Sequence, residues 1–123
     1  MKKIFLIAAV LCLVLAGCAT NPDKAKVFDP SVPEEESCFL IVPNFVNVRM
    51  FDTTQVSWHD SILGITPLQT MVRIPAGSHI LVLDYTDMSE KVYPNLILEY
   101  DFKAGSKYQI ISIPGGTVQI AEQ

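Results

Sequence analysis

The chain has 123 residues and a formal net charge of −4, and 50% of its residues are hydrophobic. Acidic side chains outnumber basic ones by 13 to 9, and beyond the first three residues the lysines and arginines are scattered singly. This pattern argues against nucleic-acid binding, which needs a basic stripe that displaces counterions from phosphates.

The first 17 residues have the layout of a secretory leader. Lys2 and Lys3 are followed by residues 4–17, which carry no charge. A membrane-spanning helix needs roughly 20 apolar residues, whereas here polar residues and a proline follow at 21–23. We therefore expect residues 1–17 to be a cleaved signal peptide and not a membrane span.

Residues 15–18, Leu-Ala-Gly-Cys, resemble the lipobox of bacterial lipoproteins. The resemblance implies that Cys18 takes a diacylglycerol group on its sulfur and becomes the first mature residue, anchored in the membrane by acyl chains such as palmitate. Several chains hold firmly, because each buried methylene contributes about 0.8 kcal/mol. Within that family, Ala19 in place of aspartate favours the outer membrane, at its periplasmic face or at the cell surface. The alternative is an ordinary signal peptide with a small cysteine at this position.

Residues 18–37 predict a flexible linker behind the anchor. They contain three prolines and a run of glutamates at 34–36, without strand or helix periodicity. When extended at about 3.1 Å per residue, such a linker reaches up to roughly 60 Å from the bilayer. In the alternative, Val27 and Phe28 pack on the following domain and shorten this reach. Loss of Lys2 and Lys3 with the leader changes the formal net charge to −6, which suits solubility beside a membrane.

Residues 38–123 predict one small all-β domain. Its clearest strand is 93–102, where Leu96, Leu98, Tyr100 and Phe102 share one face, the period of two that a half-buried strand requires. Similar patterns predict about seven strands, at residues 38–42, 46–50, 68–74, 80–85, 93–102, 108–113 and 117–120, with an eighth at 55–58. The first and fourth of these segments are apolar on both faces, which is typical of central strands.

Glycine-containing turns separate the later strands. Residues 76–78 and 104–106 share the sequence Ala-Gly-Ser, and Pro114 precedes two glycines, so we expect three chain reversals. No segment after the leader has an apolar stripe at helical spacing. The pattern predicts a small antiparallel β-sandwich.

The segments 64–68 (Gly-Ile-Thr-Pro-Leu) and 72–79 (Val-Arg-Ile-Pro-Ala-Gly-Ser-His), followed by the strand at 80–85, resemble the core of PEGA-type domains. These are small envelope β-sandwich modules. Two positions depart from that family: residues 52–54 replace a glycine hairpin, and Asp84 stands where a glycine often precedes Tyr85. A prealbumin-like sandwich with the same turns is the alternative. The resemblance implies a non-catalytic module for attachment or recognition, and no active-site residues come with it.

Few residues suggest chemistry. Cys38 is the one cysteine left after Cys12 goes with the leader and Cys18 is acylated, so it is either a buried small hydrophobe or a reactive thiol. Neither His59 nor His79 has a second histidine or cysteine at metal-ligand spacing. His59 with Asp60 is either half of a metal-dependent hydrolytic site or, as we expect, a loop histidine that caps a turn. We expect no enzyme, no metal and no cofactor.

One loop carries three carboxylates that suggest a cation site. Asp84, Asp87 and Glu90 lie in one loop that lacks the EF-hand pattern, so a solvated hairpin loop is favoured over a calcium site.

Trp58 is either a core residue or, beside Tyr85 or Tyr93, a surface for a sugar ring or a protein partner. The leading hypothesis is a lipid-anchored module that binds an envelope protein. The alternative is a module that binds a small ligand or glycan through Trp58.

Overall fold

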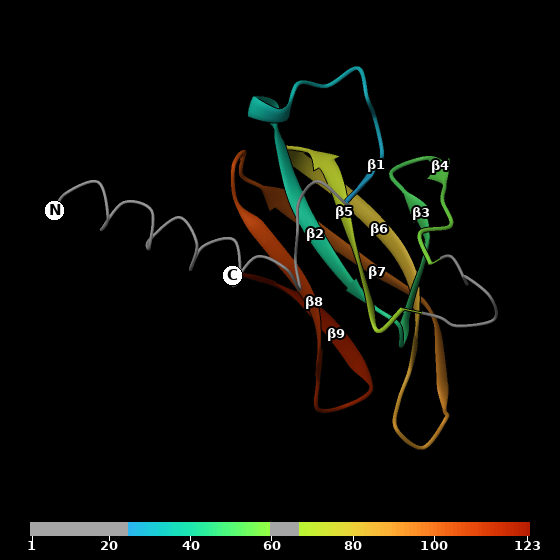
Figure 1. Cartoon of the computed structure of the whole chain (residues 1–123). Helices are drawn as coiled ribbons and strands as arrows, with labels where there is room; N and C mark the ends of the chain where they lie inside the picture. Colours follow the sequence, from blue (N-terminus) through green and yellow to red (C-terminus); the bar gives the residue numbers. More distant parts are fainter. Residues whose placement is uncertain (1–24, 60–66) are drawn as a thin grey trace, which may run out of the picture.

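The computed structural model describes residues 25–59 and 67–123 and has an all-β sandwich fold of two sheets (Figure 1). Its elements in chain order are β1 (Lys26–Val27), the 3₁₀ turn η2 (Glu34–Glu36), β2 (Ser37–Pro43), β3 (Val46–Phe51), β4 (Thr54–Gln55), β5 (Gln69–Pro75), β6 (Gly77–Thr86), β7 (Val92–Phe102), β8 (Lys107–Ile113) and β9 (Thr117–Glu122). None of the helical segments in these residues is long and apolar enough to cross a membrane.

One sheet has five strands in the order β1-β5-β2-β8-β9, and the other has four in the order β4-β3-β6-β7. Neighbouring strands are antiparallel except for two parallel pairs, β1 with β5 and β2 with β8. The second parallel pair arises because the chain reaches β8 from β7 of the opposite sheet and enters beside β2. The predicted sandwich is confirmed, and its five-stranded sheet is mixed.

The seven predicted strands form, and the two segments with apolar faces on both sides, β2 and β6, are interior strands of their sheets. Two details differ from the prediction. Leu68 precedes β5 and is 82% exposed, so it does not share the buried face of Val72 and Ile74. The eighth strand expected at 55–58 is only the two-residue β4, because the chain leaves the sheet after Gln55 to place Trp58 in the core.

The core lies between the sheets and is built from alternate residues of facing strands. Leu40 and Val42 of β2 are fully buried, as are Leu81 and Leu83 of β6. Burial of one face per strand provides the main driving force for the fold, at about 25 cal/mol per Å² of apolar surface. Cys38 belongs to this core with no exposed surface, and burial raises the pKa of its thiol to about 11. Of the two interpretations of Cys38, the structure supports the buried, unreactive one.

Residues 26–28 are attached to the domain, as in the second alternative for the linker, although of Val27 and Phe28 only the Phe28 side chain packs on it. Lys26 and Val27 pair with β5, and the Phe28 backbone N–H donates to the Arg73 carbonyl at 3.0 Å. The Phe28 ring packs on Phe51, with ring centroids 4.6 Å apart. This part of the predicted linker is therefore held by both the sheet and the core.

The glycines of the predicted turns have backbone angles that favour glycine. Gly77 and Gly105, of the two Ala-Gly-Ser turns, have φ angles of 115° and 80°, and Gly115 and Gly116 have 102° and 77°. This left-handed region strains residues with a Cβ atom. Asp52 adopts it as well, at φ 54°, in the turn where the PEGA-type pattern has a glycine.

Candidate functional site

Several predicted site residues lie outside the described residues. They are the lipid-attachment residue Cys18, Asp60, and residues 64–66 of the PEGA-like segment. The other candidates have defined positions and contacts.

Trp58 is a core residue and not a surface one. It is 6% exposed, and its ring packs against Phe28 and Phe51 at centroid distances of 6.3 and 5.7 Å. A stacking surface for a sugar requires an exposed ring face, so the contact expected in the alternative hypothesis does not form at Trp58.

Tyr85 and Tyr93 lie together, but apart from Trp58. Their rings stack with centroids 5.7 Å apart and planes inclined by 24°, and Tyr85 is only 8% exposed. Tyr85 pairs with Val46 at the start of β3, whereas Trp58 contacts Phe51 at the end of that strand. The three aromatic candidates therefore do not form one binding surface.

The His59 ring forms hydrogen bonds within the domain through both of its nitrogens. One ring nitrogen, Nε2, lies 2.7 Å from the Val46 carbonyl oxygen, and the other, Nδ1, lies 3.1 Å from the Thr70 hydroxyl. Both nitrogens are thus engaged, and neither faces an open position for a metal or a substrate. In the part of the chain that the structure describes, no three His, Cys, Asp or Glu side chains are grouped so that they could hold a metal ion.

The carboxylates of the predicted loop are also engaged locally. Asp87 accepts hydrogen bonds from the Ser89 hydroxyl and from the backbone N–H groups of Ser89 and Lys91, and these bonds hold the pKa of Asp87 below its usual value. Asp84 pairs with Arg49 at 3.1 Å and accepts the Asn95 N–H at 3.0 Å. Asp84, in β6, and Asp87, in the hairpin loop, therefore have separate local partners.

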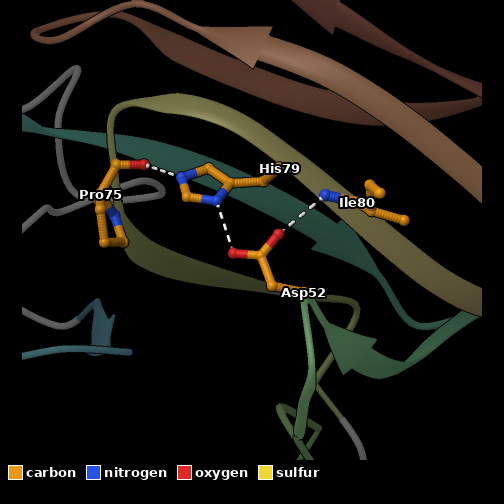
Figure 2. Close-up of polar contacts among 4 residues, drawn as sticks. All are labelled: Asp52, Pro75, His79 and Ile80. Carbon is orange, nitrogen blue, oxygen red and sulfur yellow. Dashed lines mark hydrogen bonds and ion pairs between the residues drawn. The ribbon is translucent and has the colours of Figure 1, made fainter.

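His79, the second histidine, to which the sequence assigned no role, joins two turns (Figure 2). Its Nε2 lies 2.8 Å from the Pro75 carbonyl oxygen, and its Nδ1 lies 2.8 Å from Asp52 Oδ2. The ring packs on Phe51 at a centroid distance of 4.6 Å. Both ring partners can accept hydrogen bonds, so both bonds form when both nitrogens carry hydrogen.

The Asp52 carboxylate contacts His79 through one oxygen and the backbone of β6 through the other. Its Oδ1 accepts the Ile80 backbone N–H at 3.0 Å (Figure 2). Partial burial opposes ionisation of Asp52, but the hydrogen bonds from Ile80 and His79 and the charge of His79 outweigh it, so the pKa of Asp52 lies below its usual value. Although a histidine with a carboxylate is typical of acid–base sites, the second His79 nitrogen is bound to a carbonyl and cannot serve a substrate. The pair fixes the two turns to each other.

One surface available for binding lies on the four-stranded sheet. Its face turned away from the core, here called the outer face, carries Ile80 and Ile97, which are 43% and 69% exposed. Beside them is an open hollow of about 370 Å³, lined by Arg49, Met50, Gln55, Val56, Val82 and Asn95. Arg49 is neutralised there by Asp84 and donates to the Asn95 side chain. The one sequence signal for this surface is Ile97, an apolar residue on the otherwise polar face of its strand.

In comparisons with known proteins, no family model matches the chain, and no curated protein or solved structure matches it. The class that the structure defines is an all-β sandwich, and the resemblance to lipoproteins and PEGA-type domains stays a prediction from the sequence.

Proposed function

We propose that this protein is a bacterial envelope lipoprotein, anchored by acyl chains on Cys18, whose sandwich domain is a non-catalytic interaction module. The observation that carries the anchor is the Leu-Ala-Gly-Cys sequence at 15–18, directly after an uncharged run. The location favoured by Ala19 is the outer membrane, facing the periplasm or the cell surface.

The exposed outer face supports the binding role. Apolar side chains such as Ile97 lose contact with water when a partner covers them, which favours association. By contrast, the ring nitrogens of His59 and His79 form hydrogen bonds within the domain. The glycan-binding alternative depended on an exposed Trp58, and we do not pursue it because Trp58 is buried.

Cys18→Ser tests the anchor. We expect the wild-type protein to be recovered from membranes with fatty acyl chains on its N-terminal cysteine, detectable by mass spectrometry of the mature N-terminal peptide. Cys18→Ser should abolish acylation and release the protein from the membrane on carbonate washing.

The leader offers a matched control, because Cys12 lies within it. Cys12→Ser should leave acylation at Cys18 and membrane attachment unchanged. An exported wild-type protein that carries no fatty acid, with its leader cut at another bond, would contradict the proposal.

A further inference from the structure

The outer edge of β7 is the feature that best fits a partner. We propose that residues 96–102 of β7 receive an extended segment of a partner protein in which apolar and basic side chains alternate. This inference rests on the proposed interaction role and identifies the surface and the chemistry of the partner.

β7 lies at one edge of its sheet. It pairs with β6 on one side and is the last strand on the other, and none of the described residues pairs with that outer edge. Proteins commonly blunt such edges with proline and irregular backbone. Here Pro94, and Asn95 with its φ of 59°, occupy the start of β7, whereas residues 96–102 contain neither proline nor a positive φ. Seven residues of regular edge are therefore open to strand addition.

The inner side of this edge is incompletely buried. The inward side chains of β7 at Leu96, Leu98 and Tyr100 are only half-buried, although they pack against the core. Ile120 of β9, the edge strand of the other sheet, is half-buried as well, and β9 lies beside β7. A strand added to β7 would place every second side chain over this side of the sandwich. Those side chains should be apolar.

The outer side of this edge carries negative charge. Ile97, Glu99 and Asp101 alternate with the inward residues and are exposed. Opposite charges on directly facing strand positions are stabilising, and like charges are destabilising. The outward side chains of the partner segment should therefore include lysine or arginine opposite the two carboxylates.

The same carboxylates disfavour a second copy of this chain as the occupant. Antiparallel self-pairing over the whole of residues 96–102 sets Glu99 opposite Glu99 of the second copy, and Ile97 opposite Asp101. Both juxtapositions are unfavourable. A basic segment of another protein has neither problem.

The test uses the acylated mature protein in detergent and a capped peptide of alternating valine and lysine residues. We expect the peptide to bind in a fluorescence anisotropy titration and to slow amide hydrogen exchange within residues 96–102. A peptide with glutamate in place of lysine should bind at least about tenfold more weakly, because its charges face carboxylates.

Charge reversal on the strand provides the specificity test. The double variant Glu99→Lys/Asp101→Lys should invert the preference, so that the glutamate peptide binds about tenfold more tightly than the lysine peptide. The control Glu34→Lys/Glu35→Lys changes the net charge equally on the exposed turn η2 and should leave the preference unchanged. Absence of binding by the lysine peptide, protection outside β7, equal effects of the two double variants, or a dimer held through β7 in sedimentation experiments would each overturn the proposal.

Crosslinking in intact cells separates this inference from the proposed function. A photoreactive residue at position 99 should capture a protein partner, whereas the same residue at exposed position 53, in the turn after β3, should not. Capture from position 53 but not from position 99 would overturn the assignment to β7 and leave the interaction role standing. Absence of capture from surface positions across both sheets would remove the interaction role itself.

Discussion

Asp52 occupies a turn position whose backbone favours glycine, and its carboxylate explains why an aspartate stands there. The side chain accepts the Ile80 N–H and pairs with His79, while the φ angle is 54°. Asparagine and aspartate tolerate this region better than other residues with a Cβ. At this position the hydrogen bonds compensate for the strained backbone.

Asp52→Asn is expected to lower the free energy of unfolding by about 1 kcal/mol at neutral pH, because hydrogen bonds to a charged acceptor become neutral ones. The folded state lowers the pKa of Asp52, so its contribution is present above the pKa of the unfolded chain and is lost as the pH falls through both values. Urea unfolding between about pH 3 and about pH 7 should show a smaller loss of stability on acidification for the variant than for the wild type.

Asp101→Asn, at an exposed site on β7, is the control for that prediction. It should leave both the stability at neutral pH and its slope with pH close to those of the wild type. Parallel pH profiles for wild type and Asp52→Asn would show that Asp52 does not have the assigned role.

The two glycines between β8 and β9 differ in their surroundings although both have positive φ angles. A Cβ atom at Gly116 would lie 2.5 Å from the Tyr93 ring, whereas one at Gly115 would have nothing within 4 Å. We expect Gly115→Ala to cost about 1 kcal/mol of stability, from backbone strain alone, and Gly116→Ala about 2 kcal/mol or more, because the tyrosine ring must also move. Thermal and denaturant unfolding of the two variants measure the difference, and equal losses would exclude the ring contact as a factor.

At the scale of single residues, the sequence was informative about turns and less so about partners. The Ala-Gly-Ser turns were predictable since glycine has a specific backbone role, and Cys38 was placed in an apolar run. Trp58 was ambiguous because a tryptophan between polar neighbours fits both a surface and a core position. The Asp52–His79 contact joins residues 27 positions apart, which no local pattern reveals.

At the scale of elements, β1 attaches the start of the described chain to the domain through Phe28. Phe28→Ala should destabilise the protein by about 2 kcal/mol, because the half-buried ring contacts both Phe51 and Trp58. It should also release β1 from β5 and make the peptide bond after Lys26 accessible to trypsin. Val27→Ala removes a 43% exposed side chain of the same strand and should have little effect on either measurement.

The strands themselves were predictable because alternation of apolar and polar residues is a local property. Sheet order is not local, so the edge position of β7 could not be inferred from its strong alternation. β1 was not predicted because a segment of two residues is too short to show the alternation of a strand. Its pairing also depends on β5, more than 40 residues away along the chain.

At the scale of the whole fold, the described residues share one hydrophobic core to which both sheets and Phe28 contribute. A single core predicts cooperative, two-state unfolding. Emission from Trp58, the only tryptophan, should be blue-shifted in the folded protein, and its red shift in urea should coincide with the loss of β-sheet circular dichroism. Separate transitions would show that the two sheets do not unfold as one unit.

The two-residue pairing of β1 with β5 also has a mechanical consequence. With the N-terminal anchor that we propose, a pull between the membrane and a bound partner would reach β1 before it reaches any longer strand. Peeling of β1 and the following turn would lengthen the tether by up to roughly 40 Å, since an extended residue spans about 3.3–3.6 Å. Most of the sandwich would stay intact, so the domain would yield to tension at its first strand while its binding surface on the other sheet keeps its shape.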